Sequence, residues 1–257
     1  LSSGTSSKGT SGSVLIGSGT ATGGRGGAVT ISVGSGTSGA GGVTTVLGGR
    51  SIKLTGGALV LTSGEGTATT SGKVVIRSAN ADGGASGMLV FSSGTTKSGN
   101  SGALMLGSGV ATGGRGGLVS VIAGSGASGA GGALRVAAGR STASTGGKVT
   151  VMTGEGTASA SGELIIRSAN AGKSGASGML VFSSGTSSGG DSGMLLIGSG
   201  TATGGKGGLV TVSVGSGATG AGGTLSVLAG RSTVKTGGDV GIHTGESDDD
   251  HSDKLVL

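Results

Sequence analysis

Apolar residues recur along this chain in short alternating runs, and the runs return every fifteen residues. Residues 103–117 (ALMLGSGVATGGRGG) show one repeat, and the next three begin at Leu118, Ala133 and Lys148. Within a repeat, positions 2 and 4 are mostly large and apolar, position 6 is small or Val, position 7 is Gly or Ala, and position 15 is Gly. Alternation with a period of two is typical of a pleated strand, and Gly after it indicates a turn. Each repeat is therefore predicted to open with a β-strand.

A longer period of six repeats, about 90 residues, is superimposed on the first. Residues 13–27 (SVLIGSGTATGGRGG) return almost unchanged at 103–117 and at 194–208 (MLLIGSGTATGGKGG), which puts super-repeat boundaries near residues 88 and 179. Repeats begin at Ser13, Ala28, Val43, Ala58, Lys73, Met88, Ala103, Leu118, Ala133, Lys148, Glu163, Met179, Met194, Leu209, Thr224 and Asp239, and only the one at Glu163 has sixteen residues.

A fifteen-residue unit cannot bury its apolar face alone, so repeats of this kind stack and share a core. The sequence thus predicts an all-β fold, a parallel β-solenoid (β-helix) of about seventeen 15-residue coils, as a single domain over residues 1–257. Leu1 and Leu257 both fall at position 4 of a coil, so we expect this chain to be a window of a longer repeat whose ends stack head to tail.

Positions 1 and 3 of each predicted strand should face water, yet many of them are apolar. A sheet that is apolar on both faces is normally covered on both, and a long exposed apolar stripe usually marks an interaction site. The alternative is that Val and Ile occupy these positions for β-propensity alone. We favour a chain–chain contact through the apolar residues at position 3, namely Leu15, Val60, Val75, Val90, Met105, Ile165, Val181 and Leu196.

Composition and charge change this picture little. Sixty-seven Gly residues without Pro would suggest disorder in a chain without a period, but here the period is strict. The chain has no Cys, so thiol chemistry is excluded, and no apolar run approaches the ~18 residues of a membrane span. Residues 1–238 are basic and residues 239–257 acidic, so we expect an acidic last coil to steer end-to-end docking.

Charged residues of opposite sign share position 8 of adjacent repeats. This predicted charge ladder, which would set the register between coils, consists of Arg50 with Glu65, Arg140 with Glu155, and Arg231 with Glu246. A catalytic Arg–Glu pair is the alternative, but no His, Cys or second carboxylate accompanies it. His243 and His251 share one repeat with Asp248–Asp250, where a solvated acidic end is favoured over a cation site. We therefore expect that the chain is not an enzyme and that it binds no cofactor and no metal.

Two nucleotide-related patterns occur and are disfavoured. Gly34, Gly36 and Gly39 spell a dinucleotide-binding fingerprint after a strand, but no helix follows to bind the phosphate. The Gly-Arg-Gly-Gly segments at 24–27 and 114–117 resemble nucleic-acid-binding boxes without the aromatic residues on which bases would stack. We expect no nucleic-acid partner and no membrane insertion.

Outward Thr pairs, Thr20 with Thr22 and Thr201 with Thr203, are similar to the T-x-T arrays of ice-binding β-solenoids. Arg50 and Glu65 interrupt the array in later repeats. A module that binds ice, glycan or mineral through Thr and Ser ladders stays the alternative function.

The repeats in which Val75 and Ile76 lead to Gly87, and Leu164 and Ile166 to Gly178, resemble the long Gly/Ser/Thr-rich repeat proteins of microalgal surfaces. The resemblance spans every repeat and implies an extracellular location and a structural or adhesive role in a fibre, hair or wall. With the apolar outer face, it leads us to expect a self-assembling filament subunit whose partners are like chains.

Overall fold

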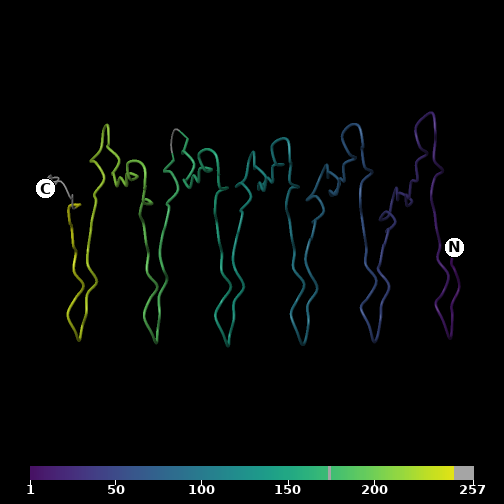
Figure 1. Cartoon of the computed structure of the whole chain (residues 1–257), viewed down its shortest axis with the longest axis horizontal. Helices are drawn as coiled ribbons and strands as arrows, with labels where there is room; N and C mark the ends of the chain where they lie inside the picture. Colours follow the sequence, from purple (N-terminus) through teal and green to yellow (C-terminus); the bar gives the residue numbers. More distant parts are fainter. Residues whose placement is uncertain (173–174, 246–257) are drawn as a thin grey trace. The chain divides into compact units, whose positions relative to one another are not determined.

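The computed structural model of the chain describes residues 1–172 and 175–245. Over these ranges the backbone contains no helix and no β-strand, and Figure 1 shows extended stretches separated by bends. The prediction of an all-β parallel β-solenoid is therefore wrong, because no sheet joins the repeats in the described ranges. The alternating segments are extended, as expected, but they are not strands of a ladder.

A bend at positions 10–12 recurs in every repeat whose turn is fully described. It lies at residues 7–9, 22–24, 37–39, 52–54, 67–69, 82–84, 97–99, 112–114, 127–129, 142–144, 157–159, 188–190, 203–205, 218–220 and 233–235. The fifteen-residue period of the sequence is thus visible in the backbone, and the turn chemistry of each repeat acts locally.

Hydrogen bonds close most repeats onto themselves. In eight repeats the N–H at position 15 donates to the C=O at position 7, with N···O distances of 2.8–3.1 Å, as between Gly42 and Gly34. In the repeats that begin at Ser13 and Ala103, the position 6 hydroxyl donates instead to the position 15 carbonyl: Ser18 to Gly27 at 2.6 Å, and Ser108 to Gly117 at 2.8 Å. These polar groups are therefore paired inside the repeat.

No described residue is buried, so the predicted inner core at positions 2 and 4 is also wrong. The large apolar side chains at position 2 are 48–61% exposed. The least exposed places belong to small residues at positions 6 and 9, which are half-buried: Ser63, Gly66, Ser78, Ala123, Gly156 and Ser168. The physical reason is that each repeat has only two or three large side chains to bury. The free energy gained by burying them is small compared with the conformational entropy lost on ordering fifteen Gly-rich residues.

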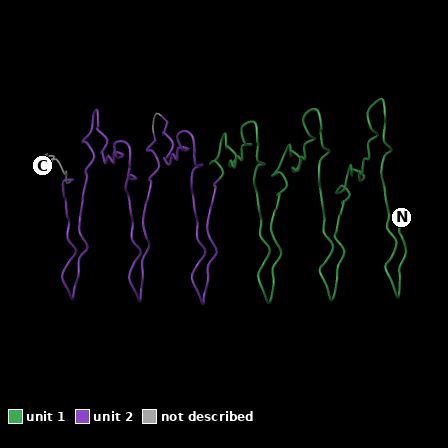
Figure 2. Ribbon diagram, viewed as in Figure 1, with its two compact units in different colours: residues 1–132 green, residues 133–257 purple. Residues whose placement is uncertain are grey.

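The chain divides into two compact units, Leu1–Gly132 and Ala133–Leu257 (Figure 2). The division falls at the junction of two fifteen-residue repeats rather than at a super-repeat boundary near 88 or 179. Each unit holds the same kind of self-closed repeat. That residues 1–257 form a single domain stays a prediction.

Candidate interaction surface

The eight apolar residues predicted to contact another chain all lie exposed at position 3. Their exposed fractions run from 62% for Val90 to 96% for Leu15, and each exceeds that of every large apolar side chain at position 2. Position 4 does not follow this order, since Ile31 is 79% exposed, so the difference in exposure separates position 3 from position 2 alone. Burial of these residues between chains stays a prediction.

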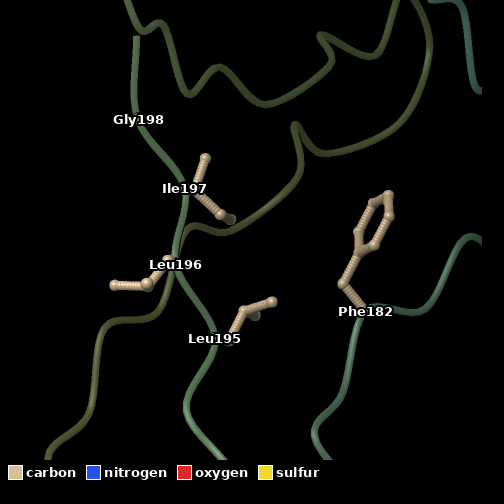
Figure 3. Close-up of a pocket in the computed structure, with 5 residues that line it drawn as sticks. All are labelled: Phe182, Leu195, Leu196, Ile197 and Gly198. Carbon is tan, nitrogen blue, oxygen red and sulfur yellow. The ribbon is translucent and has the colours of Figure 1, made fainter. Parts of the chain in front are cut away.

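The repeat that begins at Met194 shows the two sides of an extended segment directly. Leu195 and Ile197, at positions 2 and 4, point toward Phe182 of the preceding repeat, whereas Leu196 points to the opposite side (Figure 3). The three side chains line an open hollow of about 410 Å³ together with Phe182 and Gly198. In this repeat positions 2 and 4 thus face the preceding repeat loosely, and position 3 faces away from it.

We call the apolar residues at positions 1 and 3 the outer face. Besides the eight residues above, it comprises Val43, Met88, Leu118, Met179, Met194 and Leu209, which are 77–88% exposed. Charged residues at odd positions interrupt it, as Lys73 and Arg77 do on either side of Val75. Lys and Arg beside apolar extended segments limit indiscriminate pairing, and the outer face combines apolar segments with charged ones.

The residues of the predicted charge ladder are all on the surface where they are described. Arg50, Glu65, Arg140, Glu155 and Arg231 lie exposed at position 8 of their repeats. Glu246 lies outside the described residues. The register-setting role of the ladder stays a prediction.

The glycine fingerprint has a structural cause that sequence reasoning missed. A Cβ on Gly36, at position 9, would meet the carbonyl oxygens of Gly39 and Ala40, the latter at 2.9 Å. The equivalent Gly126 and Gly217 would each place a Cβ 2.5 Å from the oxygen at position 12. Carbonyl oxygens repel phosphate, so the close approach explains the Gly without a nucleotide. The sequence feature that could have indicated this close approach is that Gly occupies position 9 in only some of the repeats.

The Thr pairs of the ice-binding alternative do not lie on one flat segment. Thr22 belongs to the bend at 22–24, and Thr203 to the bend at 203–205, whereas Thr20 and Thr201 precede those bends. A flat ice-matching array would need both members of each pair on one straight stretch. The bend at position 10 therefore separates them.

Among the described residues, no three His, Cys, Asp or Glu side chains are grouped so as to hold a metal ion. His251 and Asp248–Asp250 of the acidic end lie outside the described residues, and so does the proposed docking of that end.

No membrane-spanning helix is found in the part of the chain that the structure describes. Comparisons of this chain with protein-family models, with curated proteins and with solved structures find no match. The surface geometry above is therefore what supports an argument about function.

Proposed function

We propose that this chain is a structural building block of an extracellular fibre or filament, in which like chains associate laterally through the outer face. The observation that carries the proposal is the exposure of the outer face: its large apolar side chains stay 62–96% accessible in the isolated chain. Exposed apolar surface of this extent is typical of a chain that is covered by a partner.

The accessible area gives the proposal a magnitude. The chain exposes 25402 Å². A compact monomer of 23.2 kDa would expose about 9,700 Å², and a fully extended chain about 33,600 Å². Since a specific protein–protein interface needs only about 1,000 Å², the surplus could supply contacts with several neighbours at once.

Like chains are the partner that the repeat favours. A surface that recurs every fifteen residues can be matched along its whole length only by another surface with the same spacing, and a second copy has it. Many weak contacts along one chain also act together, which raises the overall affinity well above that of one contact. The sequence also predicted end-to-end growth by stacked coils. Repeats that close on themselves do not favour such stacking, so the proposal is limited to lateral association.

The extracellular location rests on the resemblance to repeat proteins of microalgal surfaces, because a chain without Cys fits any redox compartment. A structural role needs no catalytic group. In such an assembly the exposed charged side chains would limit indiscriminate pairing between chains.

The test is the association of the full chain at micromolar concentration, followed by analytical ultracentrifugation and electron microscopy. The parent is expected to form filaments. The double variant Val75→Lys, Val90→Lys puts two charges into the outer face, so the concentration needed for assembly should rise at least tenfold, which is a loss of about 1.4 kcal/mol.

The matched control is Thr22→Lys, Thr142→Lys, which adds the same charge at two exposed bend residues outside the outer face. It is expected to assemble like the parent. A parent that stays monomeric and shapes growing ice crystals would contradict the proposal and favour the surface-binding alternative.

A further inference from the structure

Opposite charges recur at a spacing of one repeat along the whole chain, well beyond position 8. Reading fifteen residues onward from each charged residue meets an opposite charge eight times and a like charge never. The couples are Arg50–Glu65, Asp82–Lys97, Arg140–Glu155, Lys148–Glu163, Asp191–Lys206, Arg231–Glu246, Lys235–Asp250 and Asp239–Lys254. They fall at positions 1, 8, 10 and 13 and at the acidic end, so no single ladder accounts for them.

Five of these couples lie wholly in the described residues, and all ten of their side chains are exposed. No ion pair within 4.0 Å joins the two members of any of the five. The hydrogen bonds at positions 6, 7 and 15 close repeats individually instead of drawing neighbours together. The complementary charges are therefore accessible to a second chain.

We propose that two copies of this chain associate in parallel with an offset of one repeat, so that each repeat lies beside the next repeat of its neighbour. This inference rests on the proposed assembly of like chains and specifies its register. In that register the eight couples become interchain pairs, and Asp82 of one copy faces Lys97 of the other.

Other parallel registers are electrostatically poorer. With no offset, every charged residue faces its own twin, and like charges directly opposite each other are destabilising. An offset of two repeats brings no two charged residues together, and an offset of six puts Arg50 beside Arg140 and Glu65 beside Glu155. Charge pairs select register more than they supply affinity, so the apolar outer face can bind while the charges choose the offset.

An offset of one repeat also has a consequence for growth. Each added copy leaves one repeat of its neighbour uncovered, so the edge of a pair always presents an unmatched repeat to the next copy. A heterologous contact that does not close on itself gives an open filament. The register therefore yields a filament without requiring any specialised end.

The experiment mixes equal amounts of unlabelled and ¹⁵N-labelled full-length chain and lets them assemble. A zero-length carbodiimide reagent then joins carboxylates to lysines, and mass spectrometry of the digest follows three couples: Asp82–Lys97, Lys148–Glu163 and Asp191–Lys206. If the couples form between copies, about half of each cross-linked product should combine one labelled and one unlabelled peptide, as random mixing of a homo-oligomer requires.

The outcomes are distinguishable. Cross-links only within labelled or within unlabelled chains would place the couples inside one chain and overturn this register. Mixed cross-links between Lys73 and Glu163 or Lys148 and Asp239, without the three above, would show the six-repeat offset and overturn it too. In both cases assembly itself stands, whereas a parent that never assembles removes the proposed function as well.

A second measurement uses charge reversal. Asp82→Lys with Asp191→Lys should raise the assembly concentration several-fold at low salt, and the effect should shrink toward 1 M salt, where charges are screened within about 3 Å. Adding Lys97→Asp and Lys206→Asp restores the couples and the parental net charge of +6, so assembly should recover. Failure of this rescue would overturn the register.

Discussion

Single residues at position 9 decide how tightly each turn closes. Gly36 allows the carbonyls of Gly39 and Ala40 to approach its Cα, where a side chain would collide with them. Other repeats hold Ser at this position, and its hydroxyl accepts an N–H from position 12, as Ser51 does from Leu54 at 3.0 Å. Two different residues thus build the bend by two mechanisms, close backbone approach and side-chain capping.

Gly36→Ala should open its turn. The Cβ has no room beside two backbone carbonyls, so the bond from the Gly42 N–H to the Gly34 carbonyl, 2.9 Å long, is expected to break. Losing a bond worth about 1 kcal/mol accelerates amide exchange about fivefold, which hydrogen-exchange NMR at Gly42 would measure. Gly39→Ala is the control, since a Cβ there meets nothing within 4 Å. Unchanged exchange in Gly36→Ala would contradict the steric account.

The fifteen-residue repeat is the smallest element with its own hydrogen bonds, and its variants follow the six-repeat period. Closure through a Ser hydroxyl occurs in the repeats that begin at Ser13, Ala103 and Met194, and the described repeats that directly follow them close through the backbone of positions 7 and 15. A side chain at position 15 would meet the one at position 6 in such a repeat, since Ser18 Cβ lies 3.0 Å from where a Cβ on Gly27 would be. The six-repeat period is therefore present in the hydrogen bonding of the backbone as well as in the sequence.

Ser108→Ala tests this closure. The variant removes the donor to the Gly117 carbonyl, whose O···O distance is 2.8 Å, at an expected cost of about 0.5–1.5 kcal/mol to the closed turn. The ¹³C shift of the Gly117 carbonyl should move toward its random-coil value. Ser120→Ala, at an exposed position 3, serves as the control and should leave that shift alone. A Gly117 shift unaffected by loss of the Ser108 hydroxyl would show that the bond is absent in solution.

The whole chain has repeats that fold locally and apolar side chains that remain accessible. Cooperative unfolding of a small protein reflects a shared core, and no residue of the described ranges is buried. If like chains associate as proposed, cooperative stability comes from contacts between chains, and it should depend on protein concentration.

Calorimetry should show this dependence. Below the assembly concentration we expect no cooperative heat-absorption peak, and above it a peak whose temperature rises with concentration. The variant Val75→Lys, Val90→Lys should lack the peak at the concentration where the parent shows it. A sharp, concentration-independent transition in dilute parent would mean that one chain has a core of its own.

Cooling should weaken the filament. Apolar burial contributes less at low temperature, so the assembly concentration at 5 °C is expected to exceed that at 25 °C, and sulfate should lower both. Sedimentation of the unassembled fraction measures this. The opposite trend, with assembly favoured by cold, would point to polar contacts as the main driving force.

The amino-acid pattern established the fifteen-residue period and the extended segment that opens each repeat, but it placed the turn at position 7, whereas the bends lie at positions 10–12. These features are set within a few residues of each other, by Gly and Ser turn chemistry and by side-chain direction along an extended segment. Whether Val14 and Val29 would share a core depended on contacts between repeats, which no local rule decides. In the structure the amide and carbonyl groups of positions 7 and 15 bond inside the repeat, as Gly57 does with Gly49, so the solenoid predicted from stacking is absent from the described ranges. Closing nine residues costs less chain entropy than aligning repeats whose apolar side chains are few, and that balance could be seen only in three dimensions.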